Sequence, residues 1–421
     1  VQTWAITVSH ISVITLLTCS LLAALYSGRI KVYRTVVDLH LALFFSIVLL
    51  SIFTSVYAHA GRILLYKMLS CLALFYFVIN TQRRRKKLLR LCSILVIFSG
   101  IYAFTGIFWR HGSLLGFFAV QQQQPGWISL FFANHNHFAG YLELTTGLSL
   151  GLATVKSGSK RILFFSMGIL SVVGIIFSQS RGGIIAVAAG FCFYFALFIC
   201  TRRKKTETLQ VPAVFLLTVF LILISCFDLT SVVERMRSLK EAPITADEHR
   251  TEMWKGTLSM IADRPVLGWG PGCFATAFPA YKLPTHFFIR HPHNDYLELA
   301  AETGLVGLVA ALIVVYALFA SCIKKLIVAQ YIYFQPVGIG ALAGCFSFLV
   351  HAAVDFNFRI PSNAILFVVT AAIAVLAADK SSGKEEDAVC MDIMCNTTGK
   401  RVGTVLILLN AQLTYAAAKS P

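Results

Sequence analysis

The sequence predicts an all-α protein, a polytopic transmembrane bundle of about 11–12 helical spans with one large loop outside the membrane. Three observations lead to this fold class. Of the 421 residues, 57% are hydrophobic and only 13% are charged. The apolar runs are about 17–23 residues long, which is enough to cross about 30 Å of hydrocarbon. They also lack the alternating pattern of a barrel strand, and lipid cannot satisfy open backbone groups, so the spans must be helices.

The expected spans follow one another along most of the chain. They lie near 5–27, 36–58, 63–80, 89–109, 138–155, 162–178, 183–200, 211–227, 303–321, 336–352 and 362–378, with a weaker one at 403–418. This divides the chain into four regions: transmembrane helices in 1–227, an outer loop in 228–302, transmembrane helices in 303–378, and a polar linker with the weak last span in 379–421. The chain begins at Val1 rather than at Met, so whether residues precede it stays open.

The net charge of +17 does not indicate a nucleic-acid partner, because the basic residues collect in short loops between spans. Cytoplasmic loops of membrane proteins carry such an excess of Lys and Arg. The basic loops fall after alternate spans, at 29–34, 83–87, 156–161, 202–205 and 324–325. We therefore expect them on the cytoplasmic side, and the loops 110–137 and 228–302 on the opposite side.

The outer loop contains two local patterns. The run TADEHRTEMWKGTLSMIADRP has a Thr that can cap a helix, early acidic residues and a Pro that ends it. Its apolar positions predict an amphipathic helix whose buried face contains Met253, Trp254, Leu258 and Ile261. The following GWGPG at 268–272 predicts a tight turn and is weak evidence for phosphate binding.

Residues 290–304, RHPHNDYLELAAETG, combine many ionisable groups with a nearby span. Such groups at a membrane boundary are costly to keep and indicate a functional site. The pattern predicts a helix entering the membrane, with His293 at its outer end and on the same face as Leu297. Water and a polar substrate would then reach the imidazole.

Two arginines are candidates for binding an anion. Arg181, in FSQSRGG, lies at the outer end of a span, where its planar guanidinium suits a phosphate group. The alternative is that it anchors the helix at lipid headgroups. Arg250, in EHRTEMW, lies on the expected surface helix, where most arginines are simply solvated.

Three histidines, His286, His291 and His293, cluster before the span at 303. Imidazole is both a common general base near neutral pH and a common zinc ligand. The intervening Pro and the lack of an HExxH pattern favour the base, so we expect no metal and no other cofactor. The runs NHNHFAGYLEL, which contains His137, and HAAVDFNFRIP either line a cavity or cap helices.

The sequence has no Asp-x-Asp pair and no GxxxxGK[ST] loop. An enzyme built on it must therefore take a substrate that is already activated. A transporter is disfavoured, because it would place charges at mid-membrane and contain two related halves.

With SQSRGG at 178–183, EHRTEMW and DRPVLGWGPG at 248–272, and HNDYLELAAETG at 293–304, the chain resembles the O-antigen ligase and polysaccharide polymerase superfamily. These are bacterial inner-membrane glycosyltransferases with about a dozen spans and a large late periplasmic loop. NHNHFAGYLEL and HAAVDFNFRIP extend the resemblance over roughly 90–375.

The resemblance implies a donor glycan on undecaprenyl pyrophosphate and, as acceptor, lipid A-core. Arg181 and Arg250 would hold the pyrophosphate, and His293 would accept the proton of the acceptor hydroxyl. These three are therefore the expected catalytic residues. The transfer would take place on the periplasmic face, invert the anomeric centre and need no metal ion. The expected substrate-binding residues are Arg181, Arg250, Arg290, His291, Asn294 and His137. A polymerase of the same superfamily is the main alternative, followed by a protein O-glycan transferase and a lipid-linked glycan transporter.

Overall fold

The computed structural model describes residues 29–109, 134–201, 210–226, 246–281, 289–329, 333–383 and 388–392, together with residues 15 and 132. These residues are helical apart from their turns and one antiparallel pair of short strands, β1 (Arg29–Tyr33) and β2 (Ala388–Asp392). The predicted all-α transmembrane class is therefore confirmed, although the small sheet was not expected. The expected spans 5–27 and 403–418, and His286, lie outside the described residues.

The longer helices are α2 (Asp38–Phe53), α3 (Ala58–Thr81), α4 (Arg85–Trp109), α5 (His135–Val155), α6 (Gly158–Ser178), α7 (Arg181–Cys200), α8 (Gln210–Cys226), α10 (Ala246–Asp263), α12 (Asp295–Ile327), α13 (Gln335–His351) and α14 (Pro361–Ser382). Short turns of helix are α11 (Phe274–Ala277), η2 (Phe278–Ala280) and η3 (Asn357–Arg359). In the described part of the chain, α3, α4, α6, α7, α12 and α14 are long and apolar enough to cross a membrane. α2, α8 and α13 are shorter apolar helices.

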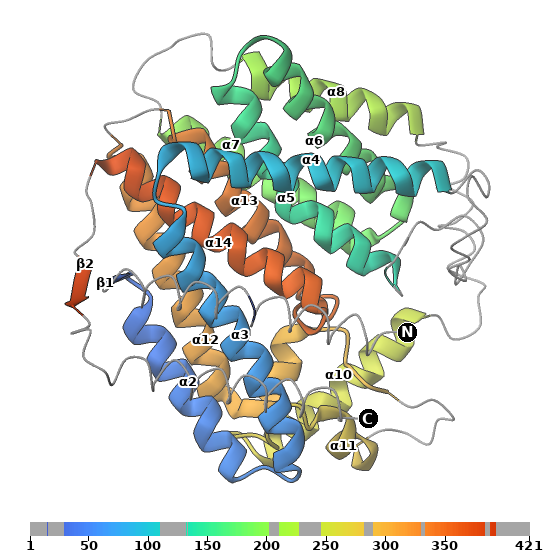
Figure 1. Ribbon diagram of the computed structural model, residues 1–421. Helices are drawn as coiled ribbons and strands as arrows, with labels where there is room; N and C mark the ends of the chain where they lie inside the picture. Colours follow the sequence, from blue (N-terminus) through green and yellow to red (C-terminus); the bar gives the residue numbers. More distant parts are fainter. Residues whose placement is uncertain are drawn as a thin grey trace.

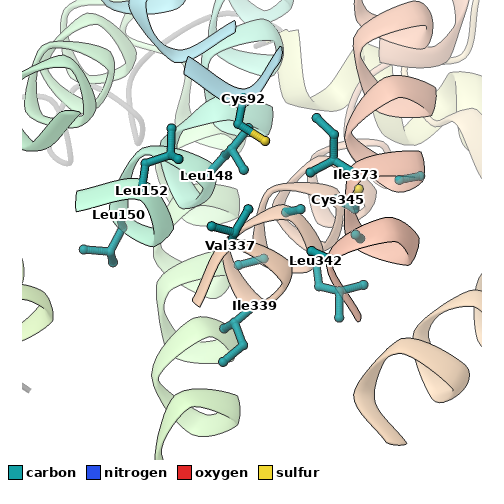
Figure 2. Close-up of a cluster of buried hydrophobic side chains, with 14 of the residues drawn as sticks. Cys92, Leu148, Leu150, Leu152, Val337, Ile339, Leu342, Cys345 and Ile373 are labelled. Atoms are coloured by element: carbon teal, nitrogen blue, oxygen red, sulfur yellow. The ribbon is translucent and has the colours of Figure 1, made fainter. Parts of the chain in front are cut away.

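The centre of the bundle is the pair α5 and α13, whose backbones approach closely because small residues face each other. A Cβ on Gly147 would lie 2.4 Å from the Gly340 carbonyl oxygen, and one on Gly344 would lie 2.4 Å from the Leu144 oxygen. α5 is buried along almost its whole length. Around this contact, Figure 2 shows side chains of α5 and α13 packed with Cys92 of α4 and Ile373 of α14.

α14 connects the two parts of the bundle. It packs on α13 and α5 on one side and on α3 and α12 on the other (Figure 1). α6 packs against α5, α7 packs against both α13 and α5, and α4 packs against α6. α2 lies beside α12. With this packing, one end of each of five helices can meet in one place, namely α5, α7, α12, α13 and α14.

The predicted amphipathic helix is present as α10, which packs on α12 near α11 (Figure 1). Met260 and Ile261 are buried, but Leu258 is 54% exposed, so its expected place on the buried face is wrong. The predicted turn after α10 is also present, because Gly268, Gly270 and Gly272 all have positive φ. Gly270 N donates to the Glu302 oxygen at 2.8 Å, which joins this turn to α12.

The two ends of the helices differ in charge. α5 begins with the histidine-rich segment at His135 and is followed by Lys156 at its other end. At that second end, Lys156 Nζ lies 3.5 Å from the Tyr333 hydroxyl, and the Arg85 guanidinium lies 3.9 Å from the centre of the Tyr333 ring. Lys325, in the last turn of α12, pairs with Asp379 of α14, with Nζ 2.6 Å from Oδ1. Basic loops thus lie at the opposite ends of the helices from the histidines.

Candidate active site

α12 begins later than expected. Its cap is Asn294, whose side chain accepts from the backbone N–H groups of Tyr296 and Leu297 at 3.0 Å. His293 therefore precedes the helix, with φ 54°, a left-handed conformation that non-glycine residues seldom adopt. The expectation that His293 shares a helical face with Leu297 is wrong. The helix is kinked at Gly304, where φ is 72°, close to the expected start of the span.

His293 contacts Asp355, a residue 62 positions away in the turn between α13 and α14. Its Nδ1 lies 3.1 Å from Asp355 Oδ1. The imidazole is 28% exposed and the carboxylate is fully buried. Because an ionised carboxylate only accepts hydrogen bonds, Nδ1 carries the proton and Nε2 keeps a lone pair. The exposed histidine is therefore oriented to act as a base.

Asp355 is kept ionised by its surroundings. Burial alone would raise the pKa of this carboxyl group, but the hydrogen bond from His293 and the neighbouring His137 and His351 hold its pKa below the ordinary value. Its Oδ1 also accepts from the Phe356 backbone N–H at 2.8 Å. A fixed negative charge thus lies behind the His293 ring, where it would stabilise a positive charge on the imidazole.

Phe356 is the centre of a histidine cluster. Its ring centroid lies 4.8 Å from that of His293, 4.7 Å from His137 and 4.4 Å from His291. The His291 ring is stacked on it, with an interplanar angle of 22°. His137 Nε2 is 3.9 Å from Asp355 Oδ1, too long for a hydrogen bond but close enough for attraction. The expected binding residues His137 and His291 therefore lie beside His293.

His291 has a carboxylate partner of its own. Its Nδ1 lies 2.9 Å from Glu298 Oε1, and the same oxygen forms an ion pair with Arg359, whose Nε lies 3.0 Å away. Arg359 also pairs with Glu302. Burial opposes the charge of Arg359, but the two glutamates raise its pKa above the ordinary value. This network ties the turn after α13 to the outer end of α12.

Arg250 lies on the face of α10 that meets the histidine segment. Trp254, one helical turn later and on the same face, donates from Nε1 to the Pro292 oxygen at 2.9 Å. Arg250 also lies close enough to interact electrostatically with His135, at the start of α5, and with His351, at the end of α13. α10 thus brings Arg250 near the ends of α5 and α13, and α5 carries His137 of the histidine cluster.

Arg181 is the first residue of α7, and its side chain is exposed. Ser180 caps the helix by accepting from Gly183 N at 3.1 Å. A Cβ on the next residue, Gly182, would lie 2.9 Å from Val354, the neighbour of Asp355. Arg181 therefore borders the same turn that supplies Asp355, at a helix N-terminus, where anions are favoured.

The other expected site residues are less close to the base. Arg290 is exposed and lies just before His291. Asn294 uses its side-chain oxygen to cap α12. No group of three His, Cys, Asp or Glu side chains within the described ranges is arranged to hold a metal ion.

The pairing of Asp355 with His293 was not predicted from the sequence. The polar groups of HAAVDFNFRIP, which are His351, Asp355 and Arg359, were expected either to line a cavity or to cap helices, because nothing local separates the two. The signal available was that 293 and 355 both fall at outer ends of expected spans. Glu143, in the run NHNHFAGYLEL, was not singled out.

The comparison with protein families agrees with the resemblance seen in the sequence. Residues 166–312 match the family described as O-antigen ligase. This segment runs from α6 into α12 and contains Arg181, Arg250 and His293. The expected superfamily is therefore confirmed.

Three curated proteins are similar to this chain. A protein of Rickettsia prowazekii (strain Madrid E) named a polysaccharide ligase is 26% identical over 220 residues, 47% of this chain and 51% of that protein. A polysaccharide ligase of Rickettsia typhi (strain ATCC VR-144 / Wilmington) gives the same values. An O-antigen polymerase of Salmonella muenchen is 26% identical over 184 residues, 43% of this chain and 44% of that protein. The chain spans about half the length of the curated relatives it matches.

Proposed function

From the premise that this chain belongs to the O-antigen ligase and polymerase superfamily, we propose that it is a glycosyltransferase that moves a glycan from undecaprenyl pyrophosphate to lipid A-core. The observation that carries the proposal is the contact of His293 with Asp355, at 3.1 Å, with the imidazole partly exposed. A histidine held this way is a general base, and the transfer of a glycan to a hydroxyl group requires one.

In the proposed reaction, His293 Nε2 accepts the proton of the acceptor hydroxyl as its oxygen attacks the anomeric carbon of the donor sugar. The new glycosidic C–O bond forms while the C–O bond to the pyrophosphate breaks, and undecaprenyl pyrophosphate leaves with the electron pair. Direct displacement inverts the anomeric centre. Asp355 stabilises the imidazolium that results.

Arg181 and Arg250 are the proposed electrophilic groups. Their guanidinium groups would bind the pyrophosphate oxygens and stabilise the charge that develops there as the bond breaks. Pyrophosphate is already a good leaving group, and two cations supply the assistance that a metal ion gives in other transferases. The mechanism therefore requires neither a metal nor another cofactor.

Three of the four remaining expected residues would contact the sugars. His291, oriented by Glu298, offers an acceptor atom to a hydroxyl group, and His137 and Arg290 border the same cluster. Asn294 would act by holding the start of α12 rather than by direct contact, since its side-chain oxygen already accepts two backbone hydrogen bonds.

The proposed location is the bacterial inner membrane, with the histidine cluster on the periplasmic side. The support is the separation of the histidines from the basic loops, since cytoplasmic loops carry the excess of Lys and Arg. Both substrates are lipids, so they would reach the site from the membrane.

A polymerase is the second candidate, and the observation that favours it is the similarity to a protein named O-antigen polymerase. The two reactions share donor and base and differ in the acceptor, which for the polymerase is another lipid-linked glycan. The arrangement of groups around His293 is compatible with either the ligase reaction or the polymerase reaction.

The test uses purified protein with undecaprenyl-pyrophosphate glycan, with and without lipid A-core, and His293→Ala as the control. We expect a core-linked product that wild type forms and His293→Ala does not. A ladder of longer glycans formed from the donor alone would instead support the polymerase. If His293→Ala transfers glycan at the wild-type rate, the proposed role of His293 is wrong.

A further inference from the structure

A second histidine–carboxylate pair lies inside the bundle, and the proposed mechanism does not use it. Glu143 of α5 and His351 of α13 are 208 residues apart, and Glu143 Oε1 lies 2.8 Å from His351 Nδ1. The exposed fraction is 0% for the Glu143 side chain and 1% for His351. Burying two ionisable groups is costly unless each satisfies the other, so the pair is retained against a cost.

The pair directly supports the start of α7. A Cβ placed on Gly182 would lie 2.9 Å from His351 Cδ2 and Nε2, and one on Gly183 would lie 3.1 Å from Glu143 Oε1. A side chain at Gly182 would clash with the His351 ring, whereas at Gly183 the nearest atom is Ala139 Cβ, at 2.7 Å, and Glu143 is a second close neighbour. Arg181 is the residue immediately before these glycines, so its position depends on where the pair holds α7.

The backbone of His351 also holds the turn that carries Asp355. The His351 carbonyl oxygen accepts from Val354 N at 3.0 Å and from Asp355 N at 3.1 Å. The side chain of His351 thus faces Gly182, while its carbonyl group fixes the backbone of Asp355. A displacement of His351 would move both neighbours.

We infer that Glu143 and His351 are positioning residues that set the place of Arg181 relative to the His293–Asp355 pair. Glu143 fixes the His351 ring, the ring supports the first turn of α7, and the carbonyl of His351 holds Asp355. The pair touches no substrate. This inference rests on the proposed function, in which Arg181 binds the pyrophosphate and His293 takes the proton.

The test measures binding of undecaprenyl pyrophosphate, without sugar, to purified protein in nanodiscs. Glu143→Leu removes the acceptor of the His351 hydrogen bond, and Gly182→Ala adds a methyl group against the His351 ring from the other side. A misplacement of about 1 Å in a binding or catalytic group can cost about 100-fold. We expect both variants to weaken binding by about 10- to 100-fold and to lower kcat further, with the acceptor KM changed less than about twofold.

Gly338→Ala is the matched control. A Cβ at Gly338, near the other end of α13 from His351, would also meet a neighbour at 2.9 Å, but that neighbour is Leu326, away from the pair. It adds the same methyl group and should leave binding within about twofold of wild type, while Glu143→Gln, which keeps an oxygen acceptor, should recover most of the loss. Circular dichroism and thermal midpoints identify the folded variants, and if Glu143→Leu does not fold, Gly182→Ala decides.

Wild-type binding in both Glu143→Leu and Gly182→Ala would overturn the inference, and so would an equal loss in Gly338→Ala. A wild-type protein that binds undecaprenyl pyrophosphate but transfers no glycan would contradict the proposed function and leave the positioning role supported by the binding data. A wild-type protein that does not bind undecaprenyl pyrophosphate would overturn both.

Discussion

Asp355 and His293 illustrate how a base can be built at a membrane surface. The imidazole stays partly exposed for a substrate, while its partner is fully buried and held ionised by its neighbours. His291 is stacked on Phe356, and the rings of His293 and His137 meet Phe356 edge-on, so one aromatic ring restrains all three imidazoles before a substrate binds. Such preorganisation is what makes a positioned base effective.

Replacing the carboxylate tests this arrangement. Asp355→Asn keeps the shape but removes the charge that stabilises the imidazolium, and an amide can also favour the wrong tautomer. We expect kcat to fall by about 100- to 10,000-fold with little change in donor KM. Steady-state kinetics measure kcat and the donor KM. The control is Asp379→Asn, which makes the same change at the opposite end of the helices. An Asp355→Asn enzyme within about twofold of wild type would show that Asp355 does not assist His293.

Arg181 can be tested by a substitution that keeps its charge. A lysine ammonium is a point charge and cannot reproduce the two parallel hydrogen bonds of a guanidinium. We therefore expect Arg181→Lys to lose at least about 90% of the transfer rate, corresponding to about 1.4 kcal/mol or more of transition-state stabilisation. Lys160→Arg, at the basic end of α6, is the matched control. Full activity of Arg181→Lys would remove the pyrophosphate role.

At the scale of elements, the site depends on helices whose ends are fixed by close packing in the middle. α5 and α13 touch through glycines, and their ends then carry Glu143 with the histidine segment and His351 with the Asp355 turn. α10 contributes from outside the bundle, because Trp254 holds the backbone of Pro292. Separate helices thus each deliver one functional group.

The α5–α13 contact gives a prediction for stability. In Gly344→Ala the new methyl group would meet the Leu144 carbonyl at 2.4 Å, and backbone atoms cannot move aside as a side chain can. We expect a loss of about 1–3 kcal/mol, measured as a lower thermal midpoint in detergent. Gly338→Ala, on the same helix but facing the flexible end of Leu326, should cost less. Equal midpoints for the two variants would contradict tight backbone packing at this contact.

The sequence predicted the elements better than the junctions between them. Helices such as α10 and α6 follow from local periodicity, capping residues and Pro or Gly stops, all within a few residues. The contact of His293 with Asp355 depends on how α12, α13 and α14 pack, over a separation of 62 residues. Likewise, the start of α12 was misjudged because the pattern around His293 fits both a helix and a capped turn, and only the Asn294 cap separates them.

At the scale of the whole molecule, polar and basic groups lie at opposite ends of the helices. His135 and Lys156 flank the same 21-residue helix, α5. The histidines, Asp355, Arg181 and Arg250 collect near the first end, and the basic loops collect near the other. A lipid-linked donor would therefore enter from one leaflet of the membrane, and the charge bias indicates the outer leaflet.

This orientation can be measured with single cysteines and a maleimide reagent that does not cross membranes. Glu252→Cys lies on α10 and Lys160→Cys lies at the basic end of α6, and both positions are exposed. In a background without reactive native cysteines, we expect Glu252→Cys to be labelled from the periplasm and Lys160→Cys only after the membrane is permeabilised. The reverse pattern would place the histidine cluster in the cytoplasm and contradict the proposed topology.

The most direct test of the account is an experimental structure of the protein in a lipid nanodisc with undecaprenyl pyrophosphate bound. We predict density for the pyrophosphate between Arg181 and Arg250, beside the His293–Asp355 pair and open to the membrane. Pyrophosphate bound instead at the basic ends of the helices, or Arg181 and Arg250 facing away from it, would contradict the account.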